Sequence, residues 1–197
     1  AGADVVKFQT FRAELLASPS ALKADYQRTV PGKNQHDILW PLELSEEDHE
    51  FLLLHSAEQK VEFLSTGFDQ SSVDFLVRLG IKRVKVPSGE ITNLPLLRHV
   101  GGKKLPILLS TGMANLGEIE AAVAVLESAG AERKDITVLH CTTAYPAPFE
   151  EVNLRAMDSI RRSLQLAVGY SDHTLGGQIA VAAAALGAEV IEKQITL

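Results

Sequence analysis

Residues 106–142 read PILLSTGMANLGEIEAAVAVLESAGAERKDITVLHCT, and this stretch decides the fold class. It begins with one short apolar run, Pro106 to Ser110, and ends with another, Ile136 to Cys141. Both runs are apolar on each face, as the strands of a covered parallel sheet are. Between them, Asn115 to Gly130 has apolar residues at helical spacing and ends at a glycine. The stretch therefore predicts a strand–helix–strand unit with parallel strands.

The same alternation of apolar run and helical pattern recurs along the chain, at intervals of roughly 20 to 30 residues. The other predicted strands are Val5 to Gln9, Glu62 to Thr66, Arg83 to Pro87, Gln165 to Gly169 and Glu189 to Glu192. The other predicted helices are Ser45 to about Gln59, Ser71 to Leu79, Leu94 to Val100, Leu154 to Arg162 and Gly177 to Leu186. Arg12 to Leu44 contains prolines and no sustained period, so we expect a long excursion over the sheet there.

Seven parallel strands with one helix per crossover are one strand short of a closed (β/α)8 TIM barrel, and a doubly wound sheet is the competing architecture. Polar residues follow nearly every predicted strand. In a barrel they would all meet on the face where barrel enzymes place their sites, whereas a doubly wound sheet would gather them at one switch point. We therefore predict an α/β fold in which residues 1–197 form one domain, an incomplete TIM barrel.

Composition and charge exclude several classes of protein. The chain has 19 basic and 25 acidic residues and a net charge of −6, with no run of Lys or Arg, so no nucleic-acid partner is expected. Its single cysteine, Cys141, excludes an internal disulfide framework, and a place in an apolar strand predicts an inert thiol. No apolar run is long enough to span a membrane, and Asp4 and Lys7 interrupt any signal-peptide core. We expect a soluble, cytoplasmic protein.

Two lysines lie within apolar strands, Lys7 in VVKFQT and Lys85 in RVKVPSGE. An unpaired ammonium is costly to bury, so each is a candidate clamp for an anion, although strand alternation could instead point it outward to water. Ser88 and Ser110 stand near strand ends beside glycines and would supply hydroxyls for a phosphate cradle. Taken singly, each of these glycine-containing segments is equally an ordinary turn.

Three further residues at strand ends carry chemistry, and each has a plainer interpretation as well. Glu90 follows the Lys85 strand, where it would contact sugar hydroxyls, transfer a proton or pair with Lys85. Tyr145 would cap a substrate or pack its own loop. His173 would ligate a metal, act as an acid or base, or cap the next helix. Because HxH, HExxH and DxD spacings are missing, one histidine alone does not establish a metal site.

Seven strings carry a resemblance over nearly the whole chain: VVKFQT, FLSTGFD, KVPSGEITNLPLL, LLSTGMANLGEIE, LHCTTAYPAPFEEVNLRAM, VGYSDHTLG and AALGAEVIEKQITL. In this order they resemble the sialic acid synthase family, also called N-acetylneuraminate synthases. The resemblance implies a (β/α)8 barrel followed by a small antifreeze-like domain. It also implies a transferase that condenses phosphoenolpyruvate with N-acetylmannosamine or a related amino sugar. KVPSGE is similar to the sialic and legionaminic branch of the family rather than the pseudaminic branch.

Matching family positions imply roles for single residues. Positions that hold the phosphate and carboxylate of phosphoenolpyruvate correspond to Lys7, Thr66, Lys85, Ser88, Ser110 and Ser171. Positions around the acceptor sugar correspond to Gln9, Glu90 and Tyr145, and the implied catalytic residues are Lys7, Lys85 and Glu90. His173 matches one of two histidines that hold a divalent ion, commonly manganese, with magnesium as the other candidate.

The resemblance also implies a mechanism. The metal polarises the open-chain sugar aldehyde, and the enol carbon of phosphoenolpyruvate attacks it. Water adds at the resulting cationic carbon, and phosphate leaves with C–O cleavage. Lysines held in place would offset the negative charge of the phosphate and carboxylate. The family's homodimer, in which the antifreeze-like domain of one subunit closes its partner's site, is expected of the parent protein.

The chain departs from the family pattern at several points. Gln194 stands at the second metal-histidine position, where an amide oxygen is a weaker ligand than imidazole for a transition metal. Thr143 stands where many relatives have an Asn that contacts the substrate carboxylate, and Gly67 replaces a usual Pro. The family's first strand, last barrel helix and antifreeze-like domain have no counterpart in the sequence. We therefore expect these residues alone not to catalyse the reaction.

Two other functions stay open at this point. Gln194 and the missing ends also fit a non-catalytic relative of the barrel that binds a sugar or phosphate or serves as a scaffold. A phosphoenolpyruvate aldolase that uses a sugar phosphate is the second alternative. It would need further basic residues for the second phosphate, which the sequence does not obviously supply.

Overall fold

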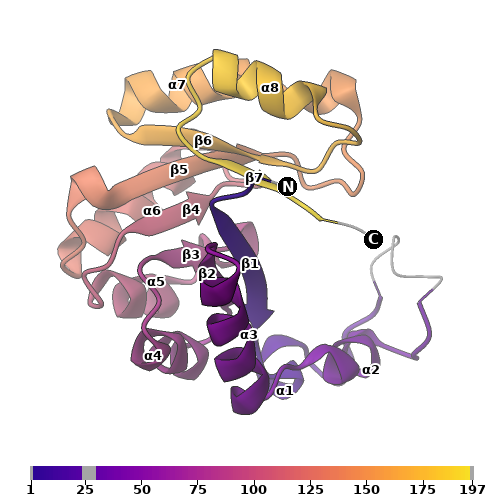
Figure 1. Ribbon diagram of the computed structural model, residues 1–197. Coiled ribbons are helices and arrows are strands. Elements are labelled where there is room, and N and C mark those ends of the chain that lie inside the picture. The colour runs from indigo at the N-terminus through magenta and orange to yellow at the C-terminus, as the bar shows by residue number, and fades with distance from the viewer. Residues whose placement is uncertain (1, 24–29, 196–197) are drawn as a thin grey trace. The chain divides into compact units, whose positions relative to one another are not determined.

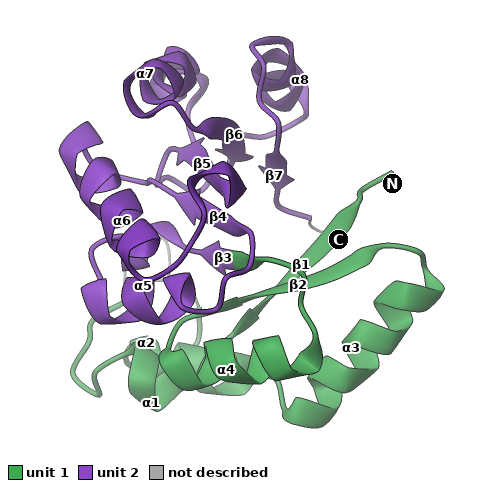
Figure 2. Ribbon diagram, turned by 90° about the vertical axis from the view of Figure 1, so that its left-hand side faces the viewer, with its two compact units in different colours: residues 1–84 green, residues 85–197 purple. Residues whose placement is uncertain are grey.

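A computed structural model describes residues 2–23 and 30–195 of the chain. The chain divides into two compact units, residues 1–84 and residues 85–197, which Figure 2 colours green and purple. Both units are built from strands that alternate with helices, as Figure 1 shows along the colour bar.

The first unit holds a pair of parallel strands, β1 (Val5–Thr10) and β2 (Glu62–Gly67). Their register places Val5 opposite Glu62 and Gln9 opposite Thr66. The described helices of this unit are α1 (Ala13–Leu16), α2 (Gln35–Leu39), the 3-10 turn η2 (Trp40–Leu42), α3 (Glu46–Glu58) and α4 (Gln70–Leu79).

Helix α3 is tied to both strands by a buried histidine. Ser45 and Asp48 form a capping box, in which each side chain accepts a hydrogen bond from the other residue's backbone N–H. His49, only 1% exposed, donates from Nδ1 to the Ser45 carbonyl at 2.6 Å and accepts from the Thr10 hydroxyl at 2.7 Å. Ser65 donates in turn to Thr10 at 2.7 Å. This chain of hydrogen bonds fixes α3 against the C-terminal ends of β1 and β2.

The second unit continues the alternation. Its strands are β3 (Val84–Val86), whose first residue belongs to the first unit, β4 (Ile107–Ser110), β5 (Ile136–Cys141), β6 (Ala167–Asp172) and β7 (Ile191–Lys193). Its helices are α5 (Leu94–Gly101), α6 (Leu116–Ser128), α7 (Arg155–Leu164) and α8 (Gln178–Ala185). The 3-10 turns are η3 (Ser88–Glu90), η4 (Arg133–Asp135) and η5 (Phe149–Glu151). Figure 1 shows α7 and α8 along the same side of β6.

The hydrogen-bonded order of the strands follows the chain, from β1 to β7. All the pairs with a defined register are parallel, as in Ile107 opposite Ile136 and Ser171 opposite Glu192. Chain order is the order of a (β/α)8 barrel, whereas a doubly wound sheet begins in its middle and reverses direction. The predicted fold class, α/β with seven strands of a TIM barrel, is therefore confirmed.

Burial follows from helices that cover the strands. All four residues of β4 are buried, and so are the last five residues of β6. Helix α6 begins at an Asn115 capping box and buries Ile119, Ala122, Val123 and Leu126, the predicted apolar stripe. The helices are short, and in the described part of the chain none is long and apolar enough to cross a membrane.

One prediction about extent is wrong. The sixth strand spans Ala167–Asp172 rather than Gln165 to Gly169, because α7 continues to Leu164 and Gln165 adopts the left-handed conformation that ends the helix. Ser171 and Asp172 therefore lie within the strand and not after it. The described residues of the excursion from Arg12 to Leu44 form the short helices α1, α2 and η2, and residues 24–29 lie outside the described residues.

The N-cap of α4 gives a testable consequence. Asp69 accepts hydrogen bonds from the Ser72 N–H at 2.8 Å and from the hydroxyls of Ser72 and Ser71 at 2.6 and 2.5 Å. Burial alone would raise the pKa of Asp69, but these hydrogen bonds outweigh it and hold the pKa below the ordinary 3.8. The carboxylate therefore stabilises the fold above that ordinary pKa, and this contribution is lost as the pH falls through the lowered pKa.

We expect Asp69→Ala to lower the free energy of unfolding by about 1 kcal/mol at pH 7, as loss of an N-cap does. Urea unfolding of both proteins at pH 7 and about pH 3 should show the difference shrinking at the lower pH. Asp158→Ala, which removes an exposed carboxylate paired with Arg162, is the control and should change stability by about 0.5 kcal/mol or less. An Asp69→Ala loss of equal size at both pH values would contradict a charged cap.

Candidate functional site

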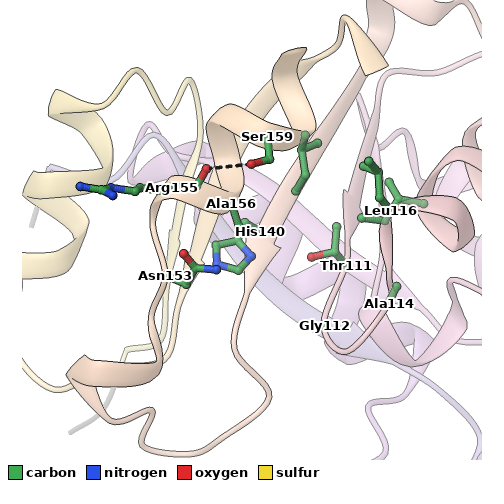
Figure 3. A pocket seen from close by; sticks show the side chains of 11 residues that line it. Thr111, Gly112, Ala114, Leu116, His140, Asn153, Arg155, Ala156 and Ser159 are labelled. Carbon is green, nitrogen blue, oxygen red and sulfur yellow. Dashed lines mark hydrogen bonds between the residues drawn. The ribbon is translucent and has the colours of Figure 1, made fainter. Parts of the chain in front are cut away.

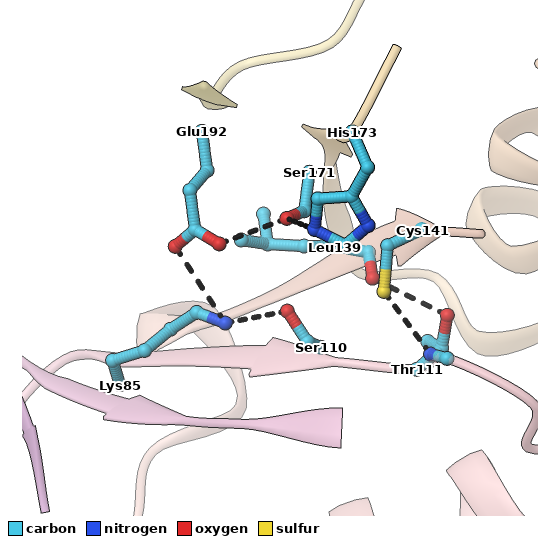
Figure 4. Close-up of polar contacts among 9 residues, drawn as sticks. Lys85, Ser110, Thr111, Leu139, Cys141, Ser171, His173 and Glu192 are labelled. Carbon is cyan, nitrogen blue, oxygen red and sulfur yellow. Dashed lines mark hydrogen bonds and ion pairs between the residues drawn. The ribbon is translucent and has the colours of Figure 1, made fainter. Parts of the chain in front are cut away.

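A buried lysine organises the polar residues of the second unit. The Lys85 side chain in β3 is 3% exposed, and its Nζ donates to the Ser110 hydroxyl of β4 at 2.5 Å. The same Nζ lies 3.6 Å from the Glu192 carboxylate of β7 (Figure 4). The interpretation of Lys85 as a lysine that reaches outward to water is therefore wrong. Its ammonium is held by a hydroxyl and a carboxylate from two other strands.

Glu192 connects Lys85 to the histidine at the end of β6. Its Oε1 accepts a hydrogen bond from Ser171 at 2.8 Å, and the Ser171 hydroxyl lies 3.4 Å from Nε2 of His173. Sequence reasoning missed Glu192 and suggested Glu90 as the carboxylate for Lys85. The available signal was strand alternation, which puts Glu192 on the face of β7 opposite to Lys193.

The orientation of His173 follows from one backbone contact. Its Nδ1 lies 2.7 Å from the Thr142 carbonyl, which only accepts, so Nδ1 carries the proton and Nε2 presents a lone pair. The Tyr145 ring stacks near it, with ring centroids 4.2 Å apart and planes 31° apart. Tyr145 is 45% exposed, so the pair forms a partly open aromatic edge to the site.

Ser88 and Thr143 meet at a glycine. Gly112 has a φ of +53°, and a Cβ added there would lie 2.6 Å from the Cβ of Ser88 and 3.1 Å from the methyl of Thr143. Its N–H donates to the sulfur of buried Cys141 at 3.2 Å. Only glycine fits this backbone and this close approach, and it keeps Ser88 and Thr143 next to the end of β4.

Glu90 lies in η3, half-buried, where its carboxylate accepts a hydrogen bond from the Asn93 side chain at 2.6 Å. This contact orients a carboxylate one turn after Lys85. It leaves the predicted acid–base role of Glu90 untested.

The first unit carries the other three predicted residues, all on β1 and β2. Lys7 is half-buried and Gln9 exposed, and because they lie two positions apart on β1 they share one face. Thr66, directly opposite Gln9, is 2% exposed. In the described part of the chain its buried Oγ1 has no hydrogen-bond partner. A buried hydroxyl without a partner is costly, which fits a group that binds a ligand.

Beside the site, strands β6 and β7 hold a second polar pair. Lys193 donates to the buried carboxylate of Asp172 at 2.8 Å, and Thr174 donates to the same carboxylate. Burial alone would raise the pKa of Asp172, but these hydrogen bonds lower it overall. The pair therefore fixes β7, and with it Glu192, against β6.

The residues present make an incomplete metal site. His173 offers one imidazole nitrogen in the right tautomer, whereas Gln194 is exposed after β7. Within residues 2–23 and 30–195, no group of three or more His, Cys, Asp and Glu side chains could hold a metal ion. The described residues therefore do not fit a divalent ion bound by the protein alone.

A pocket of about 290 Å³ lies beside the ends of β4 and β5, next to the N-terminal ends of α6 and α7 (Figure 3). None of the predicted site residues lines it. His140 in its wall has Nε2 2.8 Å from the Val152 carbonyl, to which it donates. Burial lowers the pKa of His140, although the carbonyls of Val152 and Asn153 oppose the shift, so the ring is neutral at pH 7.

Comparison with known proteins gives one consistent result. The model of the NeuB family matches residues 1–197. The chain is 54% identical over 198 residues to N,N'-diacetyllegionaminic acid synthase of Campylobacter jejuni, and 48% identical over 200 residues to the synthase of the same name from Legionella pneumophila. All of this chain aligns in both cases, with 59% and 56% of the two relatives.

Among solved structures, the N-acetylneuraminic acid (sialic acid) synthetase of Leptospira borgpetersenii, in complex with citrate, matches with a TM-score of 0.85 and 29% identity. The match covers 98% of this chain and 63% of that one. The chain thus spans less than two thirds of the length of each of these relatives.

Gly112 provides a direct test of the geometry around Ser88. We expect Gly112→Ala to lower the free energy of unfolding by about 1–3 kcal/mol, because a side chain at positive φ is strained and its Cβ would collide with Ser88. It should also weaken the binding of inorganic phosphate, measured by calorimetry. Gly89→Ala, next to Ser88 but in open space, is the matched control and should be nearly neutral. Equal behaviour of the two variants would refute the crowding at Gly112.

Proposed function

This chain belongs to the NeuB family, and we propose that it is the larger part of a nonulosonic acid synthase that condenses phosphoenolpyruvate with an N-acetylated amino sugar. The observation that carries the proposal is the buried Lys85 ammonium, which contacts the Ser110 hydroxyl of β4 and the Glu192 carboxylate of β7. A buried cation among donors is what a small, highly charged anion requires. A site for an uncharged sugar alone would have no use for it.

Phosphoenolpyruvate would be held chiefly by charge. In the second unit Lys85 contacts Ser110 and shares the Glu192 carboxylate with Ser171, and Ser88 lies against Gly112, two residues after Ser110. Donors already fixed in place stabilise a phosphate without reorganising during the reaction. The family resemblance also implies Lys7 and Thr66 of the first unit as phosphoenolpyruvate contacts, and the buried Thr66 hydroxyl, which has no hydrogen-bond partner among the described residues, supports a ligand there.

In the proposed reaction a C–C bond forms between the enol carbon of phosphoenolpyruvate and the aldehyde carbon of the open-chain sugar. The aldehyde oxygen takes up a proton, water adds at the carbon that carries the phosphate and gives up a proton, and the C–O bond to phosphate breaks. Glu90, oriented by Asn93, is proposed to move a proton at the acceptor. Gln9 and Tyr145 are proposed to contact the sugar, and Thr143 the substrate carboxylate.

The acceptor is proposed to carry two acetamido groups. The Campylobacter and Legionella synthases described above are both named for N,N'-diacetyllegionaminic acid. Phosphoenolpyruvate contains no nitrogen, so both N-acetyl groups of such a product must come from the sugar. N-acetylmannosamine, with one acetamido group, is then the poorer acceptor. The homodimer implied by the resemblance stays a prediction.

Manganese or magnesium remains a proposed cofactor that rests on His173 alone. The incomplete ligand set gives a specific alternative, a relative that binds the anion without turnover. Turnover and binding must therefore be measured separately.

The proposed reaction is tested by phosphate release from phosphoenolpyruvate, with manganese and with either acceptor. The assay is run on this chain and on the Campylobacter synthase whose 198 matching residues are replaced by this chain. We expect acceptor-dependent release by the hybrid, faster with the diacetamido sugar, and a loss of at least about 100-fold in Lys85→Met. Phosphoenolpyruvate binding without release in the hybrid would favour the non-catalytic alternative.

Gln194 is tested by metal affinity. We expect Gln194→His to tighten manganese binding about 10-fold or more, because imidazole is the stronger ligand. Magnesium affinity should change little, since magnesium prefers oxygen ligands. Calorimetry with each ion alone measures both affinities, and it does not require the protein to turn over substrate. Unchanged manganese affinity would mean that position 194 does not face the ion.

A further inference from the structure

We propose that the buried His49 is a positioning residue for the acceptor sugar, because it fixes the strand ends that carry Gln9 and Thr66. The role rests on the proposed function, in which Gln9 contacts the acceptor sugar and Thr66 contacts phosphoenolpyruvate. His49 itself belongs to α3 and acts through the first unit alone.

The His49 ring is held from three directions. Its Nδ1 donates to the Ser45 carbonyl at 2.6 Å, which leaves Nε2 to accept from the Thr10 hydroxyl at 2.7 Å. The Phe75 ring of α4 meets it edge-on, with ring centroids 5.1 Å apart and planes 88° apart. The imidazole, 1% exposed, is therefore kept in one orientation, in which Nε2 faces the last residue of β1.

The contact with β1 continues to β2. The Thr10 hydroxyl gives its proton to His49, so the Ser65 hydroxyl, 2.7 Å away, is the donor to Thr10. Thr10 is 8% exposed and Ser65 is completely buried. Removing one member of this chain would leave a buried hydroxyl or imidazole without its partner, which is unfavourable. One line of hydrogen bonds thus joins α3, β1 and β2.

The register shows which residues this line holds in place. Ser65 lies opposite Phe8, two positions before Thr10, so the Thr10–Ser65 hydrogen bond runs diagonally between the strands. The step that it spans is the one at which Gln9 lies opposite Thr66. Because side chains alternate between the faces of a strand, Gln9 and Thr66 are on the other face. The bond therefore holds the two strands together at the step that carries both predicted site residues.

The two site residues depend on the backbone for their direction. The Thr66 Oγ1 has no hydrogen-bond partner in the described part of the chain, and Gln9 is exposed. Among the described strands, β1 is hydrogen-bonded to β2 alone, so His49 gives its C-terminal end a second support. A displacement of about 1 Å in a group that orients substrate costs up to about 100-fold in rate. Loss of the His49 contact should therefore reach the acceptor through Gln9.

The test uses two substitutions at His49 that differ only in reach. Glutamine places Oε1 about where Nε2 stands, so His49→Gln can still accept from Thr10. Asparagine ends at the position of Nδ1, so His49→Asn can donate to the Ser45 carbonyl but cannot reach Thr10. Thr10→Val has nearly the same shape and removes the hydroxyl from the other side. Ser56→Ala is the control, because it deletes a buried hydroxyl of α3 that donates only to the Leu52 carbonyl.

The first measurement is amide hydrogen exchange in the whole chain, at the two ends of the strand pair. The Phe68 N–H donates to the Thr10 carbonyl at 3.2 Å at the C-terminal end, and the Glu62 N–H donates to the Asp4 carbonyl at 2.9 Å at the N-terminal end. Local opening exposes one amide and general loosening exposes both, so their ratio separates positioning from overall stability.

We expect exchange at Phe68 to be about 10-fold faster in His49→Asn and in Thr10→Val than in the original chain, with a change of about 2-fold or less at Glu62. His49→Gln and Ser56→Ala should keep the original ratio of the two rates. Equal acceleration at Phe68 and Glu62 in His49→Asn would show general loosening and would overturn the proposal.

The second measurement is the phosphate-release assay on the hybrid synthase described above, with the same substitutions. We expect the KM for the diacetamido sugar to rise about 5- to 10-fold in His49→Asn and Thr10→Val, with kcat changed by about 3-fold or less, because Gln9 is proposed to bind the sugar and not to take part in the chemistry. The sugar KM of His49→Gln should stay within about 2-fold of the original. A merely structural role would not separate the two His49 substitutions in KM.

The failure of this proposal and the failure of the proposed function give different results. An unchanged sugar KM in His49→Asn would overturn the positioning role while leaving the function standing, since the hybrid still releases phosphate. No release by the hybrid with the original His49 would overturn the proposed function, and the positioning role with it. Where His49→Asn does not fold, Thr10→Val decides the matter by the same two measurements.

Discussion

The buried ammonium group of Lys85 constrains how the strands of the second unit pack. Lys85 lies in the short strand β3, 3% exposed, and a cation there is tolerated only with partners at hydrogen-bonding or ion-pair distance. Those partners come from other strands, Ser110 on β4 and Glu192 on β7. The charge is therefore satisfied only when the strands are in their correct register. The requirement that stabilises the lysine also assembles the donors of the candidate site.

In the register of β6 and β7, a pair of residues that belongs to the candidate site is directly followed by a pair that forms a buried ion pair. Ser171 lies opposite Glu192, and Asp172 lies opposite Lys193. Because side chains alternate between the faces of a strand, the first pair joins the candidate site and the second forms a buried ion pair on the other face. A shift of one residue would exchange the two faces, so the ion pair fixes the position of Glu192.

Much of the fold could be predicted from the sequence, because parallel strands and their helices have distinct periods and clear ends. The Asn115 capping box and the apolar run Ile136 to Cys141 are local signals that the structure matches. Gln165 was predicted as the first residue of a strand, but it is the left-handed residue that ends α7. Helix propensities do not give the exact residue at which a helix ends.

The candidate site was predictable in its residue types and less so in its partners. Lys85, Ser110, Ser171 and His173 were singled out, and the structure brings them together in the second unit. Glu192, which pairs with Lys85, was not singled out, because it lies more than a hundred positions from Lys85 in the sequence. Glu90, which is near Lys85 in the sequence, was considered as its partner instead. An ion pair between distant strands depends on topology and side-chain orientation together, which no local pattern contains.

The long segment between the first two strands also bears on how the chain folds. To pair Val5 with Glu62, the chain must close a loop that contains residues 12–44 and α3, whereas the loop between Tyr170 and Ile191 contains one helix, α8. The conformational entropy lost on closing a loop grows with the logarithm of its length. Pairing β1 with β2 is therefore the most expensive closure among the registered strand pairs, and the most dependent on early contacts within the loop. His49 of α3 hydrogen-bonds to Thr10 of β1, so α3 is itself a binding partner of β1. Contact between α3 and β1 would bring the two ends of this loop closer together before β1 pairs with β2.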